Sequence, residues 1–184
     1  MRVIAGTARR LPLKTPKGKE TRPTTDRIKE TLFNMLAPLV PGSRFLDLFA
    51  GSGQIGIEAL SRGADYAVFV EQGREAAECI RENLAFTRLE PKARLIIRDA
   101  AGALRIMQGE APFDLVFMDP PYESGLVPET LRVLRGAGLV TPDTLVVAET
   151  DLKTSPDIFA DTGFVPVRTK TYKTNAHVFL RPTP

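Results

Sequence analysis

The sequence predicts an α/β fold built on a largely parallel sheet, and three observations support this prediction. Strand-like and helix-like segments alternate from residue 42 onward, which requires parallel pairing with crossover helices on both faces of the sheet. An apolar run at 45–49 leads into a glycine-rich turn at 51–56, as expected where a buried strand precedes a helix. Near the C-terminus two strand-like segments follow each other across a short polar link, which indicates an antiparallel hairpin at the sheet edge.

Length and composition indicate one domain with a small appendage. The 184 residues are 43% hydrophobic, which is enough for one well-buried core and short for two. The single cysteine, Cys79, excludes an intrachain disulfide and is expected to be a small core side chain. One cysteine and one histidine argue against a Cys/His metal site. No segment resembles a signal peptide or a membrane span, so we expect a soluble, cytoplasmic monomer without a metal or a membrane partner.

The expected elements follow one another along the chain. Residues 2–22 mix short apolar and basic pieces with prolines and glycines, which indicates an extended or hairpin-like arm. Thr24 or Thr25 is placed to cap a helix that runs to about Leu36, with Asp26 in its first turn. The predicted strands are 44–49, 66–71, 94–98, 115–118, 145–148, 164–171 and 176–180. The further predicted helices are 55–61, 74–89, 101–108, 126–134 and 156–161, and the inward face of the second of these is expected to carry Ala76, Ile80 and Leu84.

Charge is distributed unevenly along the chain. Residues 1–36 hold nine Lys/Arg against three Asp/Glu, and the rest of the chain has a slight acidic excess. A basic arm on an acidic body indicates a polyanionic partner that the arm contacts first, whereas a solvated charged terminus is the simpler alternative. The residues predicted to contact such a partner are Arg9, Arg10, Lys14, Arg22, Thr24 and Arg27.

Three acids stand at three successive predicted strand ends: Asp47, Glu71 and Asp99. The glycine pattern at 51–56 also fits dinucleotide binding, but Asp47 would repel a pyrophosphate. An amino-acid-bearing nucleoside such as S-adenosylmethionine, which carries an ammonium and a sulfonium and no phosphate, suits a carboxylate better. Glu71 is then placed to accept hydrogen bonds from a ribose diol and Asp99 from an adenine amino group, and the alternative for Asp99 is a helix cap.

The stretch Asp119-Pro-Pro-Tyr122 follows another apolar run and is the most specific signal in the chain. Two prolines fix the backbone and remove two donors, so the carbonyls there are free to accept hydrogen bonds from a substrate amine. If the Asp119 carboxylate and the Pro120 carbonyl accept its N–H bonds, a purine amine is held with its lone pair aimed at a methyl donor. Such orientation is worth about 7 to 11 kcal/mol at best. Asp119 could later receive a proton, and Tyr122 would stack on the base, although a stiff turn with a surface tyrosine is the simpler alternative.

These stretches together resemble a known family. The segments 46–53 and 58–64, the Asp119–Tyr122 motif and above all Arg22-Pro-Thr-Thr-Asp-Arg-Ile-Lys-Glu-Thr-Leu-Phe-Asn34 are similar to RsmD-type methyltransferases, which modify guanine N2 in 16S ribosomal RNA. The resemblance implies a Rossmann-like seven-stranded sheet of order 3-2-1-4-5-7-6 with strand 7 antiparallel. It implies an arm at 1–23 followed by a methyltransferase domain at 24–184.

The resemblance also implies partners and site residues. The cofactor is expected to be S-adenosylmethionine, without a metal, and the substrate to be 16S rRNA in a 30S subunit or an assembly intermediate. The target base is expected to be held by Asp119, Pro120 and Tyr122. The residues predicted to bind the cofactor are Asp47, Phe49, Gly51, Gly53, Glu71, Gln72, Asp99 and Ala100.

Two alternatives stay open on the sequence alone. Methylation of adenine N6 in DNA or RNA poses the same chemical problem, and Asp119-Pro-Pro-Tyr122 does not separate the two targets. Methylation of protein glutamine fits less well, because an amide target favours Asn at position 119, which can both donate and accept. A non-catalytic RNA-binding assembly factor with an inherited fold is the alternative of another class.

His177, in the last predicted strand, is expected to be structural and not a general base.

Overall fold

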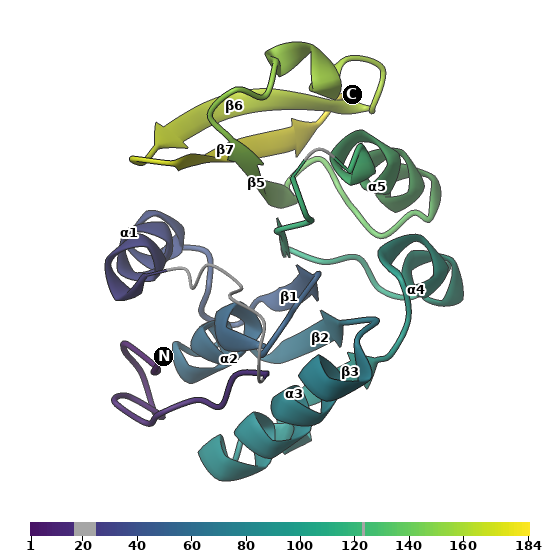
Figure 1. The fold of residues 1–184 in the computed structure, drawn as a ribbon. Coiled ribbons are helices and arrows are strands. Elements are labelled where there is room, and N and C mark those ends of the chain that lie inside the picture. Colours follow the sequence, from purple (N-terminus) through teal and green to yellow (C-terminus); the bar gives the residue numbers. More distant parts are fainter. Residues whose placement is uncertain (17–24, 123) are drawn as a thin grey trace.

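The computed structural model describes residues 1–16, 25–122 and 124–184, and within them the chain forms a seven-stranded sheet covered by helices on both faces (Figure 1). The strands are β1 (Arg44–Leu48), β2 (Tyr66–Val70), β3 (Ala93–Ile96), β4 (Leu115–Met118), β5 (Leu145–Asp151), β6 (Phe164–Thr171) and β7 (Asn175–Pro182). The helices are α1 (Asp26–Leu36), α2 (Gln54–Ser61), α3 (Arg74–Thr87), α4 (Ala100–Ile106) and α5 (Leu126–Gly136), with short 3-10 helices η1 (Glu90–Lys92) and η2 (Pro156–Phe159).

The order of strands in the sheet is β3-β2-β1-β4-β5-β7-β6. Strands β1 to β5 pair in parallel, whereas β7 is antiparallel to both β5 and β6. The expected fold class and strand order are therefore confirmed. The largest boundary difference is at the end of β5, which reaches Asp151 because it continues to pair with β7 up to Asn175.

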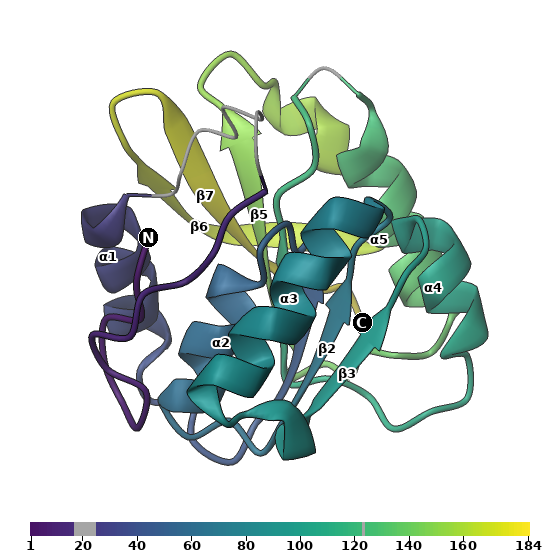
Figure 2. The same cartoon turned by 60° about the horizontal axis from the view of Figure 1, so that its bottom comes forward.

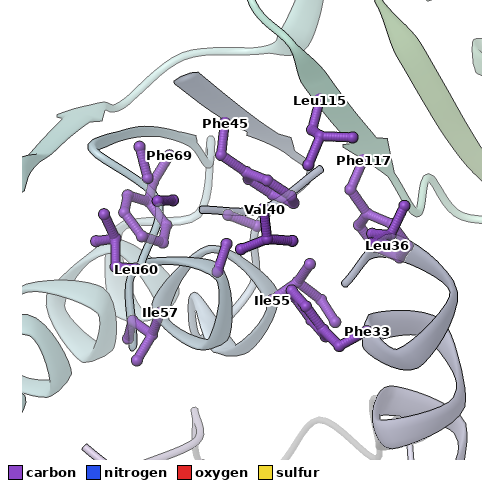
Figure 3. Close-up of a cluster of buried hydrophobic side chains, with 14 of the residues drawn as sticks. Phe33, Leu36, Val40, Phe45, Ile55, Ile57, Leu60, Phe69, Leu115 and Phe117 are labelled. Atoms are coloured by element: carbon purple, nitrogen blue, oxygen red, sulfur yellow. The ribbon is translucent and has the colours of Figure 1, made fainter. Parts of the chain in front are cut away.

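Two hydrophobic clusters cover the two faces of the sheet. Successive strand residues point to opposite faces, so Phe45 belongs to the cluster that includes side chains of α1, α2 and α3, while Leu46 belongs to the cluster that includes side chains of α4 and α5. Figure 3 shows the first cluster, in which Phe33, Leu36, Val40, Phe45, Ile55, Ile57, Leu60, Phe69, Leu115 and Phe117 lie between the sheet and the helices. Within the part of the chain that the structure describes, every helix is too short or too polar to span a membrane.

The inward face of α3 differs slightly from the prediction. Ile80 and Leu84 are buried as expected, but the buried alanine is Ala77 and not Ala76. Cys79 was expected in the core and is only partly buried, because it lies at the side of the helix and not on the face that contacts the sheet. Burial and three nearby glutamates raise the pKa of its thiol, which disfavours the reactive thiolate.

Helix α1 begins at Thr25, whose hydroxyl accepts a hydrogen bond from the Ile28 N–H at 3.3 Å, while Thr24 lies outside the described residues. The helix also buries Lys29, one of the nine basic residues among residues 1–36. The Lys29 ammonium lies 3.6 Å from the Glu58 carboxylate of α2 and donates to the carbonyl of Arg2. Burial lowers the pKa of Lys29. Because the side chain is fully buried, it cannot contact an external partner.

Residues 1–16, which we call the N-terminal segment, turn back on themselves and dock on α2. Arg2 pairs with Pro12 in an antiparallel bridge, and the Glu58 carboxylate accepts the N–H groups of Ile4 and Ala5 at 2.8 and 3.0 Å. The segment therefore packs against the body of the protein, and Figure 2 shows it lying along α1 and α2. The expected boundary between arm and domain at residues 23 and 24 lies outside the described residues.

Gly56 permits the close contact between α2 and β2. A Cβ atom at this position would lie 2.3 Å from the Cε1 atom of Phe69, which is fully buried and has no room to move. The absence of a side chain at Gly56 therefore sets the distance between helix and sheet beside the glycine-rich turn.

We expect Gly56→Ala to destabilise the protein by about 1 to 3 kcal/mol, because it overpacks the core. At an unobstructed helical site the same substitution normally raises stability by about 0.5 to 1 kcal/mol. Gly136→Ala at the end of α5, where a Cβ would meet nothing within 4 Å, is the matched control. Urea unfolding of both variants tests this, and a neutral or stabilising Gly56→Ala would contradict it.

Candidate active site

A cleft of about 610 Å³ opens at the carboxyl edge of the sheet, and most of the predicted site residues line it. The predicted residues on its walls are Asp47, Phe49, Gly51, Glu71, Gln72, Asp99, Ala100, Asp119, Pro120 and Tyr122. Gly53 is the exception, because it is the N-cap of α2 and its α-carbon faces Phe69 and Ile80. The glycine-rich turn and the Asp119 motif therefore share one cleft, as their positions at parallel strand ends predict.

The turn after β1 is tightly wound. Phe49, Gly51 and Gly53 have φ angles of 61°, 57° and 80°, in the left-handed region that favours glycine. Phe49 adopts this conformation with a side chain present, which costs on the order of 1 to 3 kcal/mol and is typical of functional loops. The turn brings the backbone close to the cleft, and α2 begins directly after the turn, at the edge of the cleft.

Asp47 at the end of β1 is almost completely buried, and its Oδ2 accepts the N–H of Gly56 at 2.9 Å. Burial raises the pKa of Asp47 to about 7, and the negative charge of Glu71 adds to the rise. A carboxylate in such a place is stabilised by a cation, which would lower its pKa again.

Glu71 and Asp99 stand at the ends of the next two strands and already bind backbone. The two oxygens of Glu71 accept the N–H groups of Gly51 and Gly73 at 2.8 and 2.7 Å. Asp99 caps α4 by accepting the N–H of Gly102 at 2.8 Å, so the structure shows this residue in the alternative role of a helix cap. Each carboxylate oxygen has a second lone pair, so both side chains keep acceptor capacity toward the cleft.

Asp119, just after β4, faces the same cleft from the other side. Burial raises the pKa of Asp119 to about 8, and the charges of Glu149 and Asp47 contribute. Three carboxylates thus interact across one partly desolvated space, which favours a positively charged or hydrogen-bond-donating ligand.

Glu149 is a site residue that the sequence analysis missed. Its Oε1 accepts the Tyr122 hydroxyl at 3.0 Å and the Asn175 amide at 2.8 Å, and its Oε2 lies 3.2 Å from Nε2 of His177. Burial by itself would raise the pKa of Glu149, but the bonds from His177, Tyr122 and Asn175 outweigh it and lower the pKa. The signal was present in the sequence, because Glu149 directly follows the predicted strand 145–148. Asp47, Glu71 and Asp99 likewise stand at the ends of predicted strands.

His177 is buried within the sheet, as its structural interpretation expects. Its ring packs edge-on against Phe117 at 5.8 Å and Tyr172 at 5.0 Å between centroids. The Tyr172 hydroxyl lies 3.4 Å from Nδ1, on the side of the ring opposite Glu149. A row of polar groups, buried at its centre and partly exposed at its two tyrosines, therefore runs from the cleft wall at Tyr122 to the turn between β6 and β7.

The basic residues predicted to contact a polyanion are spread over the surface. Arg9 and Arg10 lie at the turn of the N-terminal segment, next to the end of α2 at Ser61, which is about 12 Å from the cleft end of this eight-residue helix. Lys14 lies nearer the cleft, and its exposed ammonium pairs with Glu82. Arg27 is exposed on α1. Arg22 and Thr24 lie outside the described residues.

The cleft has the chemistry to hold S-adenosylmethionine. Its acids suit the ammonium and sulfonium charges and the ribose and adenine donors, and the turn at Gly51 allows close approach of backbone. Gln54, the first residue of α2, lines the cleft with a buried Oε1 that has no hydrogen-bond partner among the described residues. Such an acceptor is satisfied by a ligand donor. Among the residues that the structure describes, no cluster of three or more His, Cys, Asp or Glu could hold a metal ion.

Comparison with known proteins places the chain in a class. The sheet of order β3-β2-β1-β4-β5-β7-β6, flanked by helices, is the fold of S-adenosylmethionine-dependent methyltransferases. The solved structure of yhhF, a methyltransferase from Escherichia coli, has a TM-score of 0.86 and 36% identity, with 99% of this chain and 97% of that chain covered. The structure of SMU.776, a methyltransferase complexed with S-adenosylhomocysteine, shares the fold alone, with a TM-score of 0.69 and 13% identity over 83% of this chain and 49% of that chain.

The sequence comparisons define the family. A family model described as "Conserved hypothetical protein 95" matches residues 1–181. The Ribosomal RNA small subunit methyltransferase D of Escherichia coli (strain K12) is 39% identical over 153 residues, which covers 83% of this chain and 76% of that protein. The chain therefore belongs to this family, the RsmD-type ribosomal RNA methyltransferases.

The raised pKa of Asp119 predicts a pH-dependent stability difference. Its ordinary pKa of 3.8 rises to about 8 on folding, so ionising the carboxyl costs folding free energy as pH rises through this window. Asp119→Asn removes that cost, and we expect the variant to gain stability over the parent as pH rises from 5 to 8. Urea unfolding at pH 5, 6.5 and 8 measures the difference, and a gain that is equal at all three values would contradict the raised pKa.

Proposed function

We propose that this protein transfers a methyl group from S-adenosylmethionine to the exocyclic N2 of a guanine in 16S rRNA. The observation that carries the proposal is that Asp119, Pro120 and Tyr122 share a cleft with Asp47 and Glu71. One side of the cleft offers acceptors for a cationic nucleoside, and the other offers acceptors for an amine. The similarity to the Escherichia coli relative, which is named as a small-subunit ribosomal RNA methyltransferase, supports the RNA substrate.

The roles of the residues follow from their chemistry. The bound cofactor supplies an electrophilic methyl group on a positively charged sulfur. Asp119 and the Pro120 carbonyl accept the N–H bonds of the guanine amine, and this turns the nitrogen lone pair out of conjugation with the ring. Asp119 then takes the proton that the nitrogen loses, a role that requires its ionised form, and positive charge in the cleft lowers the raised pKa of Asp119 and so favours that form. Tyr122, fixed through its hydroxyl by Glu149, offers its ring to the base.

The cofactor is proposed to be held by the acids and the glycine-rich turn. Asp47 lies beside the first turn of α2, where it pairs with the amino-acid end of the cofactor together with Gln54. Glu71 and Asp99 use their remaining lone pairs for the ribose and the adenine. Phe49, Gly51, Gln72 and Ala100, which line the cleft, complete this proposed binding set, and Gly53 is proposed to contribute indirectly, as the residue from which α2 starts.

The proposed setting is a partly assembled 30S particle in the cytoplasm, with the protein acting as a monomer. A base within rRNA must be turned out of its stack before the cleft can receive it. Arg9, Arg10, Lys14, Arg22, Thr24 and Arg27 are proposed to bind phosphates around the site. Adenine N6 is the competing target, because its amine meets Asp119 in the same way.

Methylation of small-subunit particles tests the function directly. Particles from cells that lack the protein, incubated with cofactor labelled in its methyl group, are expected to gain label as N2-methylguanosine, identified by mass spectrometry of the nucleosides. Asp119→Asn is expected to lower the rate by about 10²-fold or more, because the proton acceptor is lost. Asp65→Asn, an exposed acid at the opposite edge of the sheet, is the control and should methylate normally. Label in adenine alone would refute the guanine target, and particle binding without label would indicate a non-catalytic factor.

The RNA-binding role of the N-terminal segment is tested by salt dependence. If Arg10 binds a phosphate, Arg10→Ala should weaken binding equally for RNAs of different sequence and lower the slope of log affinity against log salt by about 1. Arg105→Ala on α4, which covers the opposite face of the sheet, should leave the slope unchanged. Fluorescence anisotropy between 50 and 200 mM salt measures both, and an unchanged slope for Arg10→Ala removes Arg10 from the contact surface.

A further inference from the structure

Asn83 of α3 joins two parts of the chain that are far apart in sequence. It is almost completely buried, and its amide Nδ2 donates to the carbonyls of Lys14 and Ser52, both at 3.0 Å. Its Oδ1 accepts the N–H of Lys14 at 2.8 Å. The side chain therefore binds both backbone groups of one residue in the N-terminal segment and one carbonyl of the glycine-rich turn.

The N-terminal segment forms part of the cleft wall. Its two ends, Met1 and Pro16, line the same cleft as Asp47 and Glu71. The Met1 sulfur also lies 3.4 Å from the Ser52 hydroxyl, a second contact between the segment and the turn. A ligand in the cleft consequently meets these two residues only while the segment is docked on α2 and α3.

We propose that Asn83 is a positioning residue that couples docking of the N-terminal segment to binding of the cofactor. By fastening Lys14 to Ser52, Asn83 holds the glycine-rich turn and the segment in one arrangement, and that arrangement completes the cleft. This inference rests on the proposed cofactor, which in the cleft would contact both the N-terminal segment and the glycine-rich turn. A ligand that binds the docked state more tightly shifts the protein toward that state.

The coupling works in both directions. If the cofactor favours the docked segment and thereby raises the affinity for RNA, then bound RNA raises the affinity for the cofactor by the same factor. The segment also carries Arg9, Arg10 and Lys14, so one short piece of chain would sense both substrates. The contacts of Glu58 with Ile4 and Ala5 hold the segment on α2 at a point between its two ends, which line the cleft.

Asn83→Asp tests the proposal with little change in shape, because it replaces the two N–H donors by acceptors and keeps an acceptor for the Lys14 N–H. We expect its dissociation constant for S-adenosylhomocysteine, measured by calorimetry, to rise at least about 5-fold, the lower end of usual coupling factors. Glu82→Gln is the matched control, because it removes the exposed pair with the Lys14 ammonium and leaves the backbone clamp intact. Its affinity for S-adenosylhomocysteine should equal that of the parent protein.

Hydrogen exchange of the parent protein provides a test that does not depend on a variant folding. Saturating S-adenosylhomocysteine should slow exchange of the Lys14 N–H, whose acceptor is Oδ1 of Asn83 and which is therefore hydrogen-bonded to the body of the protein only when the segment is docked. Unchanged exchange in this segment, or equal affinity in Asn83→Asp, would overturn the coupling while leaving the proposed function intact. A parent protein that does not bind S-adenosylhomocysteine would instead refute the cofactor assignment, and the coupling with it.

Discussion

The burial of several carboxyl groups beside one another at the carboxyl edge of the sheet, to which their mutual repulsion adds, is the constraint on which the site depends. Asp47 lies near the end of β1, Asp119 follows β4, and Glu149 follows the part of β5 that pairs with β4, so the fold brings their charges together in a space that excludes much of the water. Repulsion between like charges grows as the local dielectric falls. The protein relieves it unequally: Glu149 is stabilised by three donors, whereas Asp47 and Asp119 are left with raised pKa values. The two acids that lack this support are those proposed to face the cofactor and the target amine.

The N-terminal segment is held by a different means, because it is too short to bury a core of its own. Polar side chains of the helices bind its backbone: Glu58 binds Ile4 and Ala5, and Asn83 binds Lys14. Lys29 offsets the buried charge of Glu58, which would otherwise be costly. The family-like stretch that begins at Arg22 therefore includes a residue, Lys29, whose observed contacts are structural and not with an external anion.

Local patterns were sufficient to predict the elements and the shared cleft, whereas the strand order was implied by the resemblance to a known family. Apolar runs mark the buried strands, and an acid or a glycine at a strand end marks the edge where parallel strands finish. Side-chain partners could not be predicted, because they depend on which elements pack together. Nothing in the local pattern of Lys29 distinguishes it from an exposed lysine, and the face of α3 that carries Asn83 becomes apparent only when residues 1–16 dock on it. For the same reason the choice between Ala76 and Ala77 as the buried residue depends on the exact rotation of α3 against β2 and β3.

The antiparallel strand β7 links the fold to the chemistry of the site. Its pairing with β5 places His177 directly opposite Glu149 and Asn175 opposite Asp151, in a register that a parallel strand would not give. Both side chains hold the Glu149 carboxylate, and Glu149 in turn holds the Tyr122 hydroxyl at the cleft wall. After burial, the charge of Glu149 is the next contribution to the raised pKa of Asp119. The hairpin at the sheet edge thus supports the site from behind, because it holds the carboxylate that orients Tyr122 and that adds to the proton affinity of Asp119.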